Sequence, residues 1–192
     1  MNTIGDIKSI ALGVRVANEL NRFETDLNET IKNAMNKHGL EIALEENGSS
    51  DDNMENLGHF LEYSGSVKKD LDKKYTIRVS PFDYDLRKRF TIAHELGHIL
   101  LNHPFPADFG IIKDPTENII GRPDGTFVKS SIEEKEANSF AAELLMPETL
   151  IKEKFPEPLI ESLENVDTIA KVDFKVSRAA MLVRLSSLDY LI

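Results

Sequence analysis

The most informative part of the sequence is residues 86–101, which read LRKRFTIAHELGHILL. The apolar residues of this stretch recur at helical spacing and form one stripe, made of Leu86, Phe90, Ala93, Leu96, Gly97 and Leu100. A proline cannot continue a helix, and it disfavours helical geometry in the residue before it. Because Pro104 follows, we expect a helix that begins near Asp83 and ends at Asn102 or His103. Such a stripe is typical of a helix that packs along a hydrophobic core.

The expected helix contains the pattern H-E-x-x-H at His94-Glu95-Leu96-Gly97-His98. Residues four apart project from one helix face, so His94 and His98 can both direct an imidazole nitrogen at one Zn²⁺. Glu95 is adjacent to this pair, and its carboxylate can accept a proton from a metal-bound water. A surface helix could carry these letters by chance, but here they lie in an apolar helix and use two of the five histidines in the chain. The pattern therefore predicts a metal site with Glu95 as the general base.

A catalytic zinc ion needs a third protein ligand and one open position. His103 is five residues beyond His98, so a continued helix would place it about 140° around the axis, where it cannot share the metal. The third ligand is then expected to be a carboxylate from another helix. The candidates are Glu133, Glu134 and Glu136, and periodicity alone does not choose among them.

Glu134 has the most suitable neighbour of the three. Apolar spacing predicts a helix over residues 131–146, which Pro147 ends. On that helix Glu134 and Asn138 lie four apart and face one side. The carboxylate would bind the metal, and the Asn138 side chain would hydrogen-bond one of the ligating histidines. The other acidic residues of this turn can be explained by the helix dipole, which stabilises carboxylates at a helix N-terminus.

Outside these two helices, the sequence pattern predicts helices near both ends of the chain and short strands between them. Helices are expected over residues 4–14, 24–37, 151–154, 159–163, 166–172 and 177–188, and Ser177 is the expected N-cap of the last. Strands are expected over residues 40–44, 57–63 and 75–79. Residues 105–129 contain several prolines and glycines and predict an irregular connection that could cover a cleft.

Composition limits the partners and the metal chemistry. The 192 residues carry 23 Lys and Arg against 33 Asp and Glu, a net charge of −10, which disfavours direct DNA binding because nucleic-acid phosphates repel this field. The chain has no Cys, so His, Asp and Glu must hold any metal. No apolar run is long enough to span a membrane, and the first 13 residues do not resemble a secretory signal. We therefore expect a cytoplasmic protein with no membrane partner.

Three stretches of the chain resemble the ImmA/IrrE family of zinc metallopeptidases. The first is RFTIAHELGHILL at residues 89–101, and the second is EKEANSFAAELLMP at residues 134–147. The third is FKVSRAA at residues 174–180, followed by Arg184-Leu185 and Leu188. Together they span roughly residues 75–190, well over half of the chain.

This resemblance implies a zincin-like α+β fold. It would have a small antiparallel or mixed sheet, an HExxH active-site helix and a helical C-terminal part. In the family pattern the metal ligands fall on His94, His98 and Glu134, and the general base falls on Glu95. The enzyme would be a gluzincin-like zinc metallopeptidase. Two histidines and a carboxylate can also hold Mn²⁺ or Fe²⁺.

The resemblance also implies a function. Family members are bacterial or phage proteins, and the best-known ones cleave a helix-turn-helix transcriptional repressor, which derepresses the genes that it controls. The expected substrate is a repressor encoded nearby in a prophage, a mobile element or a stress regulon. The alternative is a non-proteolytic repressor-binding protein or a toxin–antitoxin component on the same metal-binding fold. A DNA-binding regulator with a structural metal is a third reading, which the acidic charge and the open ligand position disfavour.

We expect three parts along the chain. Residues 1–38 would form N-terminal helices, 39–150 the zincin-like metallopeptidase core and 151–192 a C-terminal segment similar to a helix-turn-helix. The first part could cap the core or offer a partner-binding surface. The last could contact DNA, pack on the core or dock the substrate.

Two details of a peptidase site have candidates only. An oxyanion stabiliser could come from a Tyr or His elsewhere, and the pool includes His59, Tyr63, Tyr75 and His103. The substrate could lie as an added strand along the edge of the sheet, beside residues 75–80.

Overall fold

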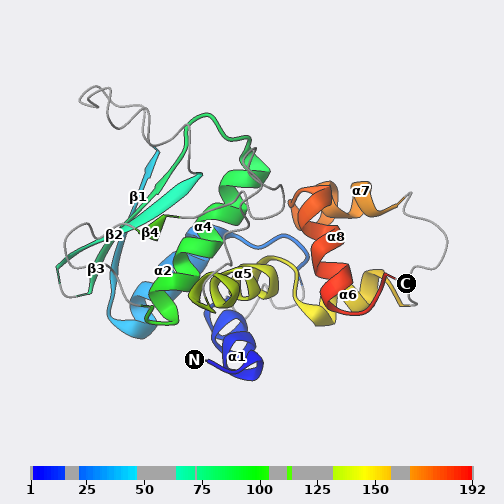
Figure 1. The fold of residues 1–192 in the computed structure, drawn as a ribbon, viewed down its shortest axis with the longest axis horizontal. Coiled ribbons are helices and arrows are strands. Elements are labelled where there is room, and N and C mark those ends of the chain that lie inside the picture. Colours follow the sequence, from blue (N-terminus) through cyan, green and yellow to red (C-terminus); the bar gives the residue numbers. More distant parts are fainter. Residues whose placement is uncertain are drawn as a thin grey trace, which may run out of the picture.

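The computed structural model of the chain describes residues 2–15, 22–46, 64–71, 73–103, 112–113, 132–156 and 165–191. It is a mixed α+β fold, with a small sheet on one side and a helical C-terminal part on the other (Figure 1). The helices are α1 (Ile4–Val14), α2 (Leu27–His38), α4 (Asp85–Leu100), α5 (Ile132–Leu145), α6 (Glu148–Lys154), α7 (Val166–Thr168), the π-helix η2 (Ile169–Phe174) and α8 (Arg178–Ser187). The strands are β1 (Glu41–Glu46), β2 (Gly65–Leu71), β3 (Lys74–Val79) and β4 (Ile112–Lys113). The predicted fold class is confirmed.

The strand order of the sheet is β1-β3-β2-β4. β1 runs parallel to β3, with Ile42 opposite Tyr75, whereas β2 is antiparallel to both β3 and β4. β3 matches the strand predicted over residues 75–79, and β1 overlaps the one predicted over 40–44. Because β3 pairs on both sides, its backbone groups are already engaged, and the predicted substrate edge beside residues 75–80 is wrong.

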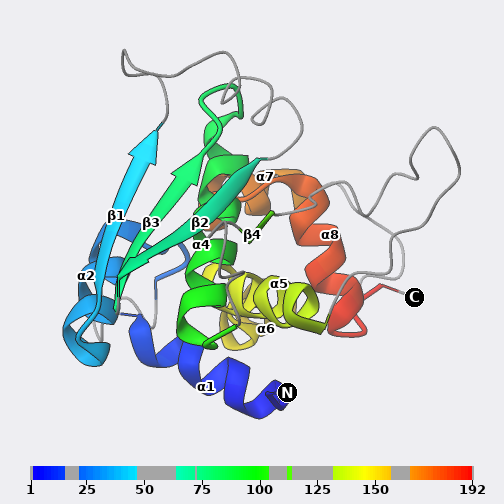
Figure 2. The same ribbon diagram turned by 60° about the vertical axis from the view of Figure 1, so that its left-hand side comes forward.

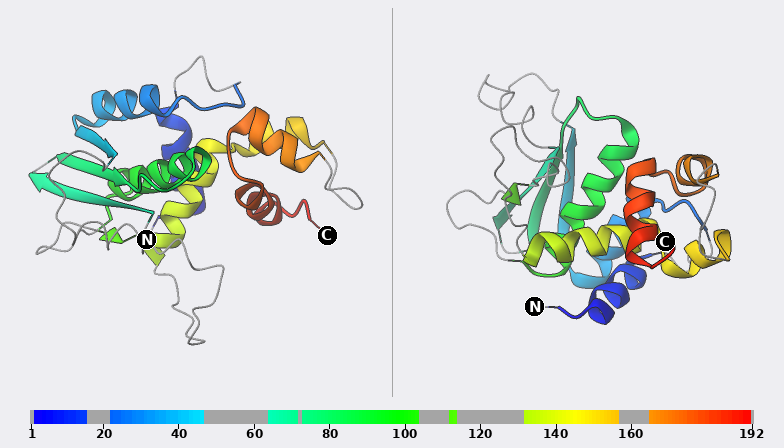
Figure 3. Two further views of the ribbon diagram at one scale, coloured as in Figure 1. Left: turned by 90° about the horizontal axis from the view of Figure 1, so that it is seen from above. Right: turned by 45° about the vertical axis from the view of Figure 1, so that its right-hand side comes forward.

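Helix α4 lies in the middle of the molecule. α4 packs against β2 and β3 on one side and against α5 on the other (Figure 2). The C-terminal helices lie beyond α4 and α5, on the side away from the sheet (Figure 3). The core therefore forms two layers around α4, and every residue of α4 from Ala93 to Ile99 is buried.

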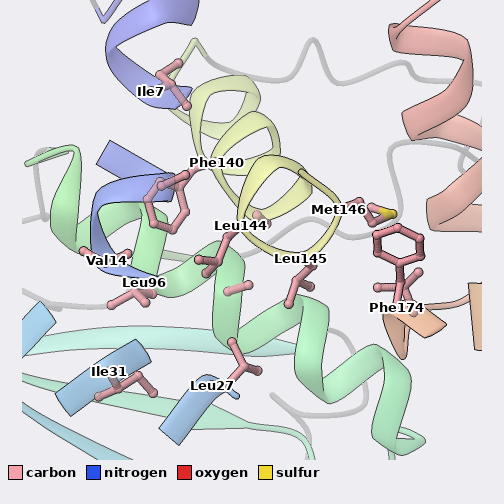
Figure 4. Close-up of a cluster of buried hydrophobic side chains, with 14 of the residues drawn as sticks. Ile7, Val14, Leu27, Ile31, Leu96, Phe140, Leu144, Leu145, Met146 and Phe174 are labelled. Atoms are coloured by element: carbon pink, nitrogen blue, oxygen red, sulfur yellow. The ribbon is translucent and has the colours of Figure 1, made fainter. Parts of the chain in front are cut away.

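The N-terminal helices belong to this core. The side chains of Ile7 and Val14 from α1 belong to the same buried cluster as Phe140 and Leu144 of α5 (Figure 4). α2 contributes buried Leu27, Ile31 and Ala34, and it ends at Gly39, which has a φ of 64°. Asp26 caps α2, so this helix begins three residues later than the predicted Glu24.

The last part of the chain follows the expected helices closely. Ser177 is the N-cap of α8 and accepts a hydrogen bond from the backbone N–H of Ala180, as predicted. The helix predicted over residues 166–172 extends to Phe174 and changes to π geometry at Ile169. The elements predicted over 57–63 and 159–163 lie outside the described residues, as does the connection over 105–129 apart from β4. Within the part of the chain that the structure describes, no helix is long and apolar enough to cross a membrane.

Candidate metal centre

The two motif histidines point at one position between α4 and α5. Both rings are fully buried, and His94 Nε2 lies 3.0 Å from His98 Nε2. Glu134 comes from the first turn of α5 and faces the same position. Its Oε2 is 3.3 Å from His94 Nε2, and its Oε1 is 3.4 Å from His98 Nε2. Three ligand atoms from two helices therefore converge, all within 4.8 Å of one another.

Close helix packing brings these atoms together. Gly97 lies between the motif histidines in sequence, and a Cβ built on it would be 3.0 Å from Cδ1 of Phe140. The missing side chain at Gly97 lets α5 approach α4, and Phe140 fills the space. This contact lies six residues, about 1.7 helical turns, beyond Glu134 and helps to set the position of α5 that carries the carboxylate.

The protonation states of the cluster suit a divalent cation. Burial raises the pKa of Glu134, but hydrogen bonds and charge from His94 and His98 outweigh burial and lower this pKa from 4.5 to about 2. Burial lowers the pKa of His98, and the hydrogen bond with Glu134 opposes this effect without cancelling it. The site thus favours an ionised carboxylate beside a neutral imidazole, which are the forms that bind a metal. Two imidazoles and one carboxylate are a common ligand set for Zn²⁺.

Each motif histidine has a partner on its outer nitrogen. His94 Nδ1 lies 3.1 Å from Oδ1 of Asn138, one helical turn beyond Glu134. This is the contact that the spacing of Glu134 and Asn138 predicts. His98 Nδ1 lies 2.8 Å from Nδ1 of His103, and this second contact was not expected.

The helical angle assigned to His103 is wrong because α4 ends before it. The helix ends at Leu100, and Asn102 has a φ of 55°, which turns the chain back. The backbone N–H of His103 then donates to the carbonyl of His98. His103 is not one of the three clustered residues, but its ring packs against His98, with centroids 4.9 Å apart. It faces the side of His98 away from the cluster, so it is not placed to stabilise an oxyanion.

The three candidate glutamates have three different environments. Glu134 faces the histidine pair, Glu136 contacts His103 and Asn2, and Glu133 is half-buried. The sequence named Glu136 as one of three alternative metal ligands, or as a first-turn acid, and did not predict its contact with His103. Asn102 followed by a histidine and a proline was the signal that α4 would end early.

Glu95 is fully buried on the sheet side of α4. Gly65, the first residue of β2, lies close to this side chain: a Cβ built on Gly65 would be 3.4 Å from Oε1 of Glu95. Among the other oxyanion candidates, Tyr75 is buried on β3, whereas His59 and Tyr63 lie outside the described residues.

A protein-family model matches most of the chain. The family model of Peptidase M78, described as the IrrE N-terminal-like domain, matches residues 51–186. No curated protein matches the chain. The matched range contains α4 and α5, and with them the whole histidine–glutamate cluster. Because the match covers more than half of the chain and bears out the family resemblance of its motifs, the chain belongs to the Peptidase M78 family of metallopeptidases.

Proposed function

We propose that this protein is a zinc-dependent endopeptidase. Its substrate is a helix-turn-helix transcriptional repressor encoded near its own gene, in a prophage, a mobile element or a stress regulon, and cleavage in the cytoplasm derepresses the controlled genes. Family membership supports the peptidase activity. The observation that carries the proposal is the convergence of His94 Nε2, His98 Nε2 and the Glu134 carboxylate on one point.

In this proposal the three converging residues would hold Zn²⁺. When bound, the ion supplies Lewis-acid chemistry, which polarises a peptide carbonyl and makes water more acidic. Asn138 accepts a hydrogen bond from Nδ1–H of His94, so it keeps the Nε2 lone pair of that histidine on the metal side.

Glu95 is the proposed general base. Its carboxylate takes a proton from the attacking water and delivers that proton to the amine nitrogen as the peptide C–N bond breaks. The position of Glu95 next to His94 supports this role, and so does its full burial, which strengthens electrostatic interactions at the site.

The proposed partner is a protein and not DNA. The net charge of −10 opposes binding of nucleic acid, and two of the basic side chains in the helix-turn-helix-like segment are paired with carboxylates of this chain. Arg184 is buried and paired with Glu143 of α5, and Lys171 pairs with Asp167 at 3.0 Å. The buried contact of Arg184 with α5 favours a packing role for residues 166–187.

The direct test is to incubate the zinc-loaded protein with the neighbouring repressor and to weigh the products by intact mass spectrometry. We expect two repressor fragments whose masses add up to the intact chain plus one water. Glu95→Gln should abolish both fragments and keep the metal, because the substitution removes the base and leaves the ligands in place. Glu133→Gln is the matched control and should cleave as the wild type does.

Other results would point elsewhere. An uncut repressor that co-elutes with the metal-loaded protein would support the non-proteolytic binding or toxin–antitoxin reading. Retained cleavage by Glu95→Gln would overturn the proposed mechanism. Metal analysis of protein purified without added metal would decide between Zn²⁺, Mn²⁺ and Fe²⁺, which this ligand set can all bind.

A further inference from the structure

A line of hydrogen-bonding groups runs from His98 to the N-terminal segment. His98 Nδ1 lies 2.8 Å from His103 Nδ1, and His103 Nε2 lies 3.2 Å from Oε2 of Glu136. Asn2 then donates to both oxygens of that carboxylate, from its backbone N–H at 2.9 Å and from its side-chain amide at 2.6 Å. His98 is fully buried, and His103 and Glu136 are buried as well.

We propose that His103 and Glu136 are positioning residues for the metal centre. They hold His98 in the tautomer that carries its proton on Nδ1 and presents the Nε2 lone pair to the metal. This inference rests on the proposed metal site, and it adds two residues that the H-E-x-x-H pattern does not include.

The direction of the hydrogen bonds follows from the carboxylate at the end of the line. A carboxylate only accepts hydrogen bonds, so the nitrogen of His103 that faces Glu136 must carry a proton. A neutral imidazole with its proton on Nε2 has a lone pair on Nδ1. That lone pair faces His98 Nδ1, which must therefore be the donor of the 2.8 Å contact.

The opposite tautomers conflict with two parts of the site. If His103 carried its proton on Nδ1, its bare Nε2 would face the Glu136 carboxylate, and two acceptors would lie 3.2 Å apart. His98 would then carry its own proton on Nε2, which points into the cluster at His94 and Glu134. A proton there would occupy the lone pair that a metal needs.

Helix α5 thus serves the cluster at three positions. Glu134 faces the metal-side nitrogens, Asn138 accepts directly from His94, and Glu136 acts on His98 through His103. Asn2 fixes the Glu136 carboxylate from the segment before α1. The Nδ1 atom of each histidine therefore has a hydrogen-bond partner. For His94 this is Asn138, and for His98 it is His103, which Glu136 holds in turn.

The test is the affinity for Co²⁺ and Zn²⁺, measured with the full chain by competition against a chromophoric chelator. His103→Phe keeps a ring of similar size but removes the acceptor, and we expect affinity to fall about 10–100-fold, as is typical when an outer partner of a metal ligand is lost. His103→Gln can still accept from His98 and donate to Glu136, so it should recover most of this loss. Glu136→Gln should weaken binding as well, whereas Glu133→Gln, which removes a carboxylate from the same turn, should not.

A double-mutant comparison separates positioning from general loss of stability. If Glu136 acts through His103, then His103→Phe combined with Glu136→Gln should weaken metal binding no more than His103→Phe alone. Circular dichroism and the Tm of each metal-free variant will show whether it is folded. Additive losses from the two substitutions would overturn the proposal.

The tautomers can be observed directly by ¹⁵N NMR of the histidine rings. In the zinc-loaded protein we expect protons on Nδ1 of His98 and on Nε2 of His103. A proton on Nδ1 of His103 would overturn the proposal while leaving the metal site intact. A wild-type protein that binds neither Co²⁺ nor Zn²⁺ would instead overturn the proposed function, and this inference with it.

Discussion

At the residue scale, the cluster combines groups that would be costly to bury separately. An isolated buried carboxylate carries a large desolvation cost, and here two histidine rings at 3.3 and 3.4 Å offset it. The pKa of Glu134 therefore lies near 2 in spite of burial. The same arrangement keeps the carboxylate ionised at neutral pH, ready to bind a cation.

Replacing Glu134 by Gln should remove most of the metal affinity. The amide keeps the shape of the side chain but loses the negative charge that balances a divalent cation. We expect the Kd for Zn²⁺ to rise by more than ~100-fold. Losing a residue that only hydrogen-bonds to a metal ligand raises the Kd by up to about that factor, and Glu134 is a proposed ligand itself. Isothermal titration with Zn²⁺ measures the effect, and Glu133→Gln is the control. An unchanged Kd would show that the cation binds elsewhere.

The sequence predicted the residues that face the cluster better than those behind it. The spacing of His94 and His98, and of Glu134 and Asn138, depends only on the period of a helix, which is set locally. The position of His103 depends on where α4 ends, and that is decided at Asn102 by a single backbone angle with a φ of 55°. A helical angle calculated past that point has no meaning.

At the element scale, β2 is the strand whose first residue, Gly65, lies close against α4. Residues 65–71 read GSVKKDL and lack the apolar alternation of a half-buried strand, so no strand was predicted there. Only its pairing with β3 reveals it, with Val67 opposite Ile77. The predicted strand over 75–79 was confirmed, but its central place in the sheet depends on β2 and could not be predicted.

Gly65→Ala should destabilise the protein through contact with α4. A Cβ at this position would lie 2.2 Å from Cγ2 of Thr91, 3.1 Å from the carbonyl oxygen of Arg78 and 3.4 Å from Oε1 of Glu95. The strand or the helix must shift, and overpacking of this kind costs about 1–3 kcal/mol of unfolding free energy. Urea denaturation of the metal-free protein measures the change.

Thr91→Ser provides the matched control for Gly65→Ala. It removes Cγ2, the nearest atom to the new methyl group, so the double variant should recover a large part of the stability that Gly65→Ala loses. Recovery would place the strain at this contact. A double variant no more stable than Gly65→Ala alone would place the strain at the Arg78 carbonyl instead.

At the scale of the whole molecule, the N-terminal and C-terminal helices are both fastened to α5. α1 packs its buried face on α5, and Asn2 reaches Glu136. From the other side, the buried Arg184 of α8 pairs with Glu143 and donates to the carbonyl of Met146 at 3.0 Å. The division into parts at residues 38 and 150 stays a prediction. Helix α5, which carries Glu134, contacts elements from both ends of the chain.

One surface link between these parts can be tested by pH. Glu148, in the first turn of α6, pairs with Lys152 at 2.5 Å and with Lys8 of α1. Hydrogen bonds from Lys152 and Lys8 lower its pKa from 4.5 to about 2. The carboxylate therefore stabilises the folded protein above pH 4.5, and this contribution is lost as the pH falls from about 4.5 toward 2.

We expect Glu148→Gln to lower the unfolding free energy at pH 7 by about 0.2–1 kcal/mol, because water and salt screen a partly exposed pair. The difference from the wild type should shrink steadily below pH 4.5 and vanish only below about pH 2, where the wild-type carboxylate is also neutral. Urea denaturation across this pH range measures it, with Glu153→Gln, an exposed position on the same helix, as the control. A difference that persists unchanged to pH 2 would mean that Glu148 acts through its shape and not its charge.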